Sequence, residues 1–337
     1  MSITIKTMSE LVSVIVPAYN AASRIRPCLE SIAAQDYWDI EIIVVDDASA
    51  DGTGETARKI LEASGRDYSV ITHESNKGVS SARNTGIENS SGKYICFVDS
   101  DDVVRENFVS LLHASIADGK CDVSFCGFTD RFMDGRKDVS IISSCGEPHI
   151  SGGEKFILRG EVPPVWSCIY RADFLRQFGI LFLEGCSSGE DIDFITRAFC
   201  RADRVTFVRE YLYVYVHHEG MTSIRDNDTR EKRLLRYEHN TAAQLNTAEY
   251  LRDYAKSKSL RDMAGKILVP QNVIRHLNIS AMKSDREGYV SLLKDAEAMK
   301  NLRNALSFFT LKHKPEVFMK ALMLKYFSGI YYMMRAK

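Results

Sequence analysis

The sequence lacks several features that would place it in a simple class. Its 337 residues include only 7 prolines and 2 tryptophans, and no run approaches the roughly 18 apolar residues that a membrane-spanning helix needs. The first ten residues, MSITIKTMSE, have one lysine and no apolar core, so they do not resemble a secretory signal. These absences favour a cytoplasmic protein.

No charge is in excess either. The chain has 44 basic and 45 acidic side chains and a formal net charge of -1, which argues against a protein that coats nucleic acid. The 8 cysteines include no C-x-x-C pair, and several lie in apolar runs, so we expect reduced, buried thiols rather than zinc ligands. With 45% hydrophobic and 26% charged residues, the composition is globular and excludes disorder, collagen and a disulfide scaffold.

The first hundred residues alternate between short apolar runs and segments with helical spacing. Strands are predicted at 11–16, 40–45, 68–72 and 93–98. Helices are predicted at 24–34, 53–63 and 79–89. This alternation is typical of βαβ units on a parallel sheet, so the expected fold class is α/β. Several of these strands end in polar or acidic residues, and ligands of open α/β sheets bind at the carboxyl ends of strands.

The pattern changes farther along the chain. A helix is predicted at 104–117, strands at 122–128 and 204–208, and a hairpin or loop at 129–164. Beyond residue 225 no strand is expected, and segments such as 230–254 have the pattern of amphipathic helices. We therefore expect a domain boundary near residue 225, with a helical region at 226–337.

The segment Asp99-Ser100-Asp101-Asp102 directly follows a predicted strand. Carboxylates spaced i and i+2 at a strand end can share Mg²⁺ or Mn²⁺, which prefers oxygen ligands and would bridge to the phosphates of a nucleotide. The alternative is a helix cap, because Asp and Ser commonly satisfy the free amides at a helix start. The segment alone does not decide between the two.

The segment VVDDASADGT places two aspartates at another strand end. A carboxylate there could accept an N–H of a nucleobase or the hydroxyls of a ribose, or it could serve only the turn that Asp51-Gly52 predicts. The DGT at 51–53 is similar to haloacid-dehalogenase phosphatases, but Ser49 stands where their nucleophilic aspartate would be. A dinucleotide fingerprint G-x-G-x-x-G and a phosphate loop of the G-x-x-x-x-G-K-[ST] type are both missing.

Five motifs, in order and in register, resemble the family 2 glycosyltransferases. They are VSVIVPAYN, LESIAAQ, EIIVVDDASADGT, NKGVSSARNTGI and GKYICFVDSDD, and the resemblance extends from about residue 11 to residue 223. It implies a GT-A fold, in which a Rossmann-like, mostly parallel sheet is flanked by helices, here at 1–225. The nucleotide-sugar-binding half would be about 11–103 and the acceptor half about 104–225. It also implies inverting transfer from a nucleotide-diphosphate sugar, with a UDP-sugar favoured.

The resemblance further implies roles for individual residues. The donor-binding positions would be Pro17, Ala18, Tyr19, Asn20, Asp47, Lys77, Arg83, Asp99, Ser100 and Asp101. The ligands of Mg²⁺ or Mn²⁺ would be Asp99, Asp101 and His218, with the adjacent His217 as the alternative histidine. Two positions depart from the family pattern, because Val216 stands where a basic residue is frequent and Cys168 replaces the lysine of the segment WSCIYR.

Glu190-Asp191 at a predicted helix start matches the family's catalytic pair. A carboxylate within reach of an acceptor hydroxyl can act as a general base, worth about 10²–10⁴-fold in rate. The alternative is a pair of carboxylates that the helix dipole favours. We assign the base to Asp191 and acceptor orientation to Glu190. Trp166 could stack on a sugar or belong to the core.

Residues 311–337 mix lysines with Phe, Met, Leu and Tyr. Such a basic amphipathic segment could lie on the inner face of a membrane, or pack on its own domain or a second subunit in a homodimer. The leading function is thus metal-dependent transfer of a sugar to a glycan or lipid-linked acceptor in surface polysaccharide synthesis. A catalytically inactive accessory subunit would not need Asp99, Asp101 and Asp191 together. A nucleotidyltransferase would need a glycine-rich loop where AYNAASR stands.

Overall fold

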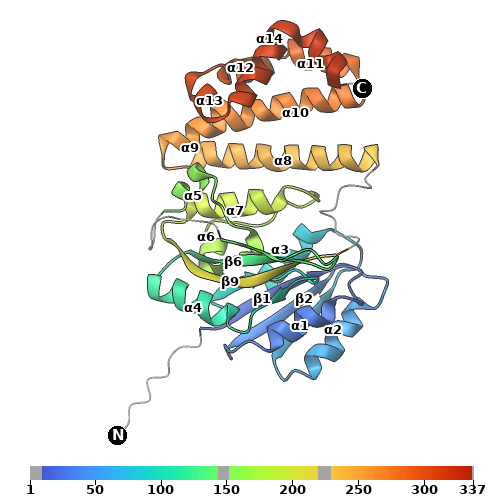
Figure 1. Cartoon of the computed structure of the whole chain (residues 1–337), viewed down its shortest axis with the longest axis vertical. Helices are drawn as coiled ribbons and strands as arrows, with labels where there is room; N and C mark the ends of the chain where they lie inside the picture. Colours follow the sequence, from blue (N-terminus) through green and yellow to red (C-terminus); the bar gives the residue numbers. More distant parts are fainter. Residues whose placement is uncertain (1–9, 143–151, 219–228, 336–337) are drawn as a thin grey trace.

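A computed structural model describes residues 10–142, 152–218 and 229–335 (Figure 1). Four parallel strands form the first half of its sheet, namely β1 (Val12–Ala18), β2 (Ile40–Asp46), β3 (Asp67–Thr72) and β4 (Tyr94–Phe97). The helices between them are α1 (Ile25–Ala33), α2 (Thr53–Glu62) and α3 (Val79–Asn89). All seven elements predicted for this part are confirmed, with ends shifted by at most two residues.

The strand order in this half is β3-β2-β1-β4. In Figure 1, α1 and α2 lie below the sheet and α3 lies above it, so both faces are covered. Every residue of β1 is buried for that reason, which explains its continuous apolar sequence. The chain runs outward from β1 to β3 and then returns to the other side of β1. In open α/β sheets, ligands bind outside the carboxyl ends of the strands at such a reversal.

The second half of the sheet is mixed. It continues from β4 in the order β8 (Cys168–Arg171), β6 (Val123–Phe132), β9 (Val205–His217) and β5 (Val103–Val104), and β7 (Val139–Ile141) pairs with β6. β8 is antiparallel to both of its neighbours, whereas β6 and β9 are parallel. The helices of this half are α4 (Phe108–Gly119), α5 (Glu154–Arg159), α6 (Ala172–Gln177) and α7 (Glu190–Arg201), with a 3₁₀ turn at Val165–Ser167.

Several predicted boundaries in this half were wrong. The helix predicted at 104–117 begins only at Phe108, because Val103–Val104 pairs with β9 as a short strand. The strand predicted at 204–208 extends to His217, because it remains paired with β6 along its length. The predicted hairpin or loop at 129–164 does contain the β6–β7 hairpin, but also helix α5, and its residues 143–151 lie outside the described ranges.

Residues 229–335 contain helices only, as predicted. They are α8 (Arg230–Tyr254), α9 (Lys258–Met263), a π-helical turn (Ala264–Leu268), α10 (Val269–Met282), α11 (Arg286–Lys294), α12 (Ala296–Asn304), α13 (Phe308–His313) and α14 (Pro315–Arg335). Helix α8 lies between α7 and the remaining helices in Figure 1. The predicted boundary near residue 225 falls outside the described residues.

The described residues form two hydrophobic cores. Leu251 of α8 and Leu260 of α9 belong to the core of the sheet, whereas Leu277 of α10 and Leu324 of α14 belong to a second, helical core. Across the described ranges, six cysteines are buried, Cys186 is half-buried, and none is in a disulfide, as expected. No helix in the part that the structure describes is long and apolar enough to cross a membrane.

Candidate functional site

The loops after β1 and β2 are tied together at one edge of the sheet. The backbone N–H of Asp47 donates to the carbonyl of Ala18 at 2.9 Å. Asn20 has a left-handed backbone (φ 47°), and its side-chain oxygen accepts from the N–H of Ala50 at 3.1 Å. Of the predicted donor-binding residues here, Pro17 and Ala18 are buried, while Tyr19 and Asn20 are exposed. The exposed pair directly follows the carboxyl end of β1.

Asp47 is buried, and both of its carboxylate oxygens make hydrogen bonds within the protein. One oxygen accepts from the backbone N–H of Lys77 at 2.9 Å and lies 2.7 Å from Nδ1 of His73. The other accepts from the N–H of Gly78 at 2.7 Å. Asp47 thus fixes the loop that leads into α3, and the Lys77 side chain of that loop is exposed. A contact of Asp47 with a nucleobase would add to these bonds.

Arg83 of α3 connects two acidic segments that are far apart in the sequence. Its side chain is only 3% exposed, and its two terminal nitrogens donate to Asp99 at 2.8 Å and to Asp191 at 2.5 Å. The guanidinium also lies 5.1 Å from the ring centre of Phe182, which Asn84 holds through two backbone hydrogen bonds. The predicted donor residue Arg83 therefore also reaches the predicted catalytic base.

The electrostatics of this group follow from burial and proximity. Burial by itself lowers the pKa of Arg83, but Asp191 and Asp99 raise it by more, so the guanidinium stays charged. Burial raises the pKa of Asp99, and Asp191 adds to the rise, while Arg83 opposes it. Arg83, whose side chain is buried, binds both carboxylates, so its positive charge offsets the repulsion between them.

The two adjacent histidines point to different partners. Nε2 of His218 lies 2.9 Å from a carboxylate oxygen of Asp101, whereas Nε2 of His217 lies 2.9 Å from Asp130 on β6. His217 also stacks on Phe132, with 4.4 Å between ring centres. Of the two candidates, the structure brings His218 to the acidic segment.

The three predicted metal ligands are not gathered equally. Asp101 and His218 meet, while Asp99 is bound to Arg83. Among the described residues, no three His, Cys, Asp or Glu side chains form a group that could hold a metal ion. Mg²⁺ is commonly bound by one or two carboxylates plus the phosphates of its substrate. The carboxylate and imidazole present here therefore fit a cation whose remaining ligands come from the donor.

Asp102 anchors this acidic segment to β9. It is buried, and it accepts from the hydroxyl of Tyr213 at 2.7 Å and from the N–H of Val216 at 2.8 Å. Burial raises its pKa well above the ordinary range, and Asp99 adds to the rise. Through these bonds, the end of β9 and the segment after β4 are fixed side by side, which brings His218 to Asp101. Ser100 is half-buried between them.

Glu190 and Asp191 begin helix α7, as predicted. Asp191 is 36% exposed, with one oxygen held by Arg83. Glu190 is only 8% exposed, and its Oε2 has no hydrogen-bond partner among the described residues. Burial raises the pKa of Glu190 to about 7, and the neighbouring Asp191 contributes. The pair thus combines an open, oriented carboxylate with a buried carboxyl group that is partly protonated near neutral pH.

Trp166 is 8% exposed and lies in an aromatic stack. Its ring is stacked on Tyr213 at 4.3 Å and on Tyr215 at 5.5 Å, and it meets the edge of Phe128 at 4.9 Å. Trp166 therefore packs against aromatic side chains of β9. Its predicted contact with an acceptor stays a prediction.

Helix α8 supports the loop that leads to Glu190. His239 Nδ1 accepts from the backbone N–H of Ser187 at 3.0 Å, and the amide of Asn240 donates to Ser188 Oγ at 2.6 Å. Gly189 has φ +88°, and a Cβ there would lie 2.8 Å from Oδ1 of Asn240. One turn further, fully buried Asp193 accepts from Thr247 at 2.7 Å. Helix α8 of the helical region therefore supports the start of α7, where Glu190 and Asp191 lie.

The residues that support the predicted site residues were not predicted from the sequence. Tyr213, Phe182, His73 and the contact residues of α8 carry no recognisable motif, and each acts through a partner at least 26 positions away. Only the isolated Gly189 before the acidic pair could have indicated a close approach.

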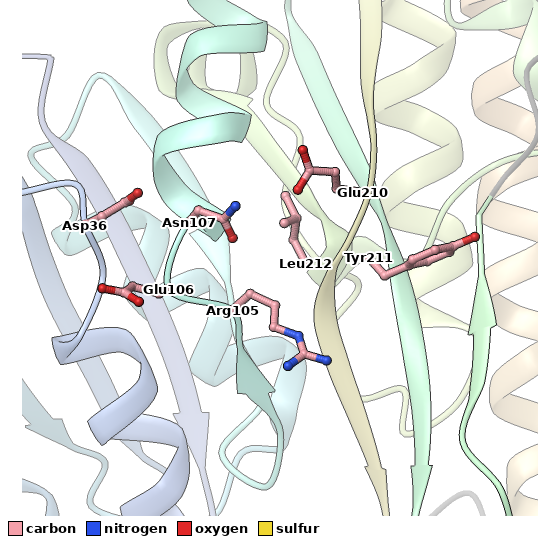
Figure 2. Close-up of a pocket in the computed structure, with 7 residues that line it drawn as sticks. All are labelled: Asp36, Arg105, Glu106, Asn107, Glu210, Tyr211 and Leu212. Atoms are coloured by element: carbon pink, nitrogen blue, oxygen red, sulfur yellow. The ribbon is translucent and has the colours of Figure 1, made fainter.

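A pocket of about 530 Å³ opens beside β9 (Figure 2). It is lined by Asp36, Arg105, Glu106, Asn107, Glu210, Tyr211 and Leu212. None of the predicted site residues lines it. The acidic and basic groups described above, rather than this pocket, form the candidate site.

A family model described as Glycosyl transferase family 2 matches residues 13–180. The glycosyltransferase EpsJ of Bacillus subtilis (strain 168) is 34% identical over 222 residues, or 62% of this chain and 61% of that protein. The glycosyltransferase EpsH of the same strain is 32% identical over 251 residues, or 73% of this chain and 72% of that protein. The match covers only 32% of the length of another relative, the glycosyltransferase GlyA of Streptococcus pneumoniae.

A further relative is the Escherichia coli UDP-Glc:alpha-D-GlcNAc-diphosphoundecaprenol beta-1,3-glucosyltransferase WfgD, 42% identical over 93 residues, or 28% of this chain and 36% of that protein. Among solved structures, residues 1–349 of Staphylococcus aureus TarS in complex with UDP-GlcNAc superpose with a TM-score of 0.64 at 24% identity, over 97% of this chain and 88% of that one. The Pyrobaculum calidifontis mannosyltransferase PcManGT with GDP-Man and Mn²⁺ gives 0.54 at 17% identity, over 96% and 88%. These likenesses show a GT-A-like fold with a helical C-terminal region.

Proposed function

Because the chain belongs to the family 2 glycosyltransferases, we propose that it transfers a sugar from a UDP-sugar to a hydroxyl of a glycan or lipid-linked acceptor in surface polysaccharide synthesis. The UDP-GlcNAc complex of TarS supports a UDP-sugar donor, since that structure shares the fold. The printed name of WfgD supports a lipid-linked acceptor. Enzymatic transfer follows from the family itself, so the inactive accessory subunit and the nucleotidyltransferase are not proposed.

The observation that carries this proposal is the position of Arg83. Asp99 belongs to the acidic segment expected to face the donor, and Asp191 begins the helix expected to face the acceptor. A single buried guanidinium holds both carboxylates, at 2.8 Å and 2.5 Å. The two halves of the proposed reaction are thus brought to one place, which is what transfer between two bound substrates requires.

The proposed mechanism is a single in-line displacement. Arg83 binds one oxygen of Asp191 and orients the carboxylate, whose other oxygen takes the proton of the acceptor hydroxyl. The acceptor oxygen then forms a bond to the anomeric carbon while the bond from that carbon to the diphosphate oxygen breaks. Attack from the opposite face inverts the configuration, and the bonding electrons leave with the nucleoside diphosphate.

Asp101 and His218 would hold the divalent cation, Mg²⁺ or Mn²⁺, together with the diphosphate. When bound, such a cation neutralises the charge that develops on the leaving group. The Mn²⁺ in the similar mannosyltransferase structure supports this choice. Asp102 and Tyr213 would fix the two ligands relative to each other, because they bind the segments that carry them.

Glu190 would bind the acceptor. Its Oε2 is buried without a partner, and a buried polar atom in that condition is costly unless a ligand satisfies it. With a pKa of about 7, part of the Glu190 population carries a proton that it can donate to an acceptor oxygen. It therefore orients the hydroxyl group that Asp191 deprotonates.

The substitution Asp191→Asn tests the proposal. The amide keeps the size of the carboxylate but cannot take a proton, so we expect transfer to fall by about 10²-fold or more. Binding of UDP with Mn²⁺, measured by calorimetry, should remain near the wild-type value. Asp253→Asn, at an exposed surface ion pair, is the matched control and should be fully active. Wild-type turnover in Asp191→Asn would remove this residue from the base role.

A further inference from the structure

The outward side of helix α14 carries an exposed apolar stripe. Met319, Tyr326, Ile330 and Met333 are each between 50% and 61% exposed. Met319 and Tyr326, seven residues apart, lie on one side of the helical segment before Phe327, and Ile330 and Met333, three residues apart, lie on one side of the segment after it. The opposite side of α14 is already buried in the helical core, for example through Ala321 and Leu324. We call this stripe the outer face of α14.

A kink interrupts the helix within this face. Phe327 has φ -136° and ψ 37°, outside the helical range, and its side chain is 56% exposed. Met334, one turn beyond Ile330, is 64% exposed. A soluble helix that packs only on its own domain has one apolar side and one polar side. Helix α14 instead has a second apolar side, and a contiguous exposed patch of this kind marks an interaction surface.

The charged residues of α13 and α14 are mostly basic. Residues 308–335 include the basic Lys312, Lys314, Lys320, Lys325 and Arg335. Glu316 is the single acidic residue of that stretch of sequence. Lys312, Lys314, Lys325 and Arg335 are exposed, and Lys320 is half-buried, so the segment that carries the apolar stripe presents mostly basic charge to solvent. A helix with this composition lies in the plane of an anionic lipid surface.

We propose that the outer face of α14 docks on an anionic lipid bilayer. Its Met, Tyr, Phe and Ile side chains enter the boundary between headgroups and acyl chains, while the lysines bind the lipid phosphates. A second copy of this chain is a poorer occupant, because it would bring two strongly basic faces together. An anionic bilayer instead attracts these basic side chains.

Figure 1 shows α14 at the end of the molecule opposite the sheet, with α8 and α10 in between. Docking through α14 therefore leaves the strand ends of the candidate site uncovered. A bilayer location suits the acceptor of the proposed function if that acceptor is lipid-linked, and to that extent the inference rests on the proposed function. The docking surface itself depends only on α13 and α14.

The test is flotation of the full chain with vesicles of phosphatidylcholine alone or of phosphatidylcholine mixed with phosphatidylglycerol. We expect binding to the mixed vesicles only, and release as salt rises, because exposed charges are screened. The variant Tyr326→Ser/Ile330→Ser/Met333→Ser should bind at least about ten-fold more weakly. Met133→Ser, which changes an exposed apolar residue (68%) in the turn after β6, is the control and should bind as the wild type does.

Retention of the thermal shift with UDP shows that a variant has folded and that its donor site is intact, so failure of docking and failure of the proposed function are separable. If the triple variant does not fold, Lys320→Gln/Lys325→Gln replaces it, with the same expected loss. No binding of the wild type to mixed vesicles would overturn the proposal. So would equal binding by the variants, or a homodimer that the triple substitution dissociates.

Discussion

Arg83 is the residue on which the geometry of the candidate site depends most. A buried guanidinium is costly unless carboxylates satisfy it, and here two of them do, from segments 16 and 108 residues away. Its planar fork allows one side chain to bind both carboxylates at once, whereas a lysine would offer a single point of charge. Arg83 therefore determines how far Asp99 lies from Asp191.

The substitution Arg83→Lys should lower kcat/KM by about 10²-fold, because a displacement near 1 Å at the reacting groups has that effect. The protein should still fold, since the positive charge is kept. Arg26→Lys, at an exposed ion pair with Glu30, is the matched control and should show no change. Steady-state kinetics compare the two variants, and an Arg83→Lys enzyme with wild-type kcat/KM would show that the fork is not needed.

Glu190 should make the stability of the protein depend on pH. Its pKa rises from 4.5 to about 7 on folding, chiefly through burial, so the folded state binds more protons than the unfolded state between these values. The free energy of unfolding should then fall as pH rises from 4.5 to about 7, by up to about 3 kcal/mol. Glu190→Gln should remove this part of the slope in urea denaturation. An unchanged slope in the variant would contradict the raised pKa.

The sequence motifs indicated candidate site residues but not the partners that these residues contact in the structure. His217 and His218 are adjacent, and side chains of successive residues in extended chain point to opposite sides. The motif could not show which side faces Asp101, since that depends on the pairing of β9 with β6. The motifs also could not predict the contact between Arg83 and Asp191, because a local sequence pattern carries no information on a partner 108 positions away.

At the scale of elements, the most informative contact is the support that α8 gives to the start of α7. Gly189 lies in the left-handed region (φ +88°) with no room for a side chain against Asn240. His239 and Asn240 hold the two serines that precede it. The direction in which Glu190 and Asp191 point is therefore set by a helix outside the sheet.

The substitution Gly189→Ala should lower kcat by about ten-fold or more, because the added Cβ displaces the catalytic pair. Gly179→Ala is the matched control, since Gly179 also has a positive φ (+58°) but nothing within 4 Å of the new Cβ. Both variants should lose about 1–2 kcal/mol of stability from the left-handed backbone. Equal effects of the two variants on kcat would contradict the role of α8.

The elements themselves were predictable to different degrees. The βαβ units of the first hundred residues were predicted well because each strand and helix is encoded locally, by apolar runs and helical periodicity. β5 and the second half of β9 were not, because two-residue and bulged strands exist only through their pairing partners. Helix α5 was missed inside a polar, glycine-containing stretch with weak periodicity.

At the scale of the whole molecule, the chain joins a GT-A-like sheet to a helical stack that has a core of its own. Helix α8 contributes to the core of the sheet and also contacts the loop before Glu190, so the helical region supports the candidate site. The predicted division at residue 225 stays a prediction. The composition indicated helices there, but it could not show which of them reach the site.

The most direct test of the central claim is a thermal-shift measurement of the wild-type chain with a panel of nucleotides and nucleotide sugars, each with and without Mn²⁺. A ligand that binds only the folded state at about 100 times its Kd stabilises it by about 2.7 kcal/mol. We predict a Mn²⁺-dependent shift with UDP that one UDP-sugar increases, which would identify the donor for transfer assays. No shift with any nucleotide diphosphate, with or without Mn²⁺, would contradict the account.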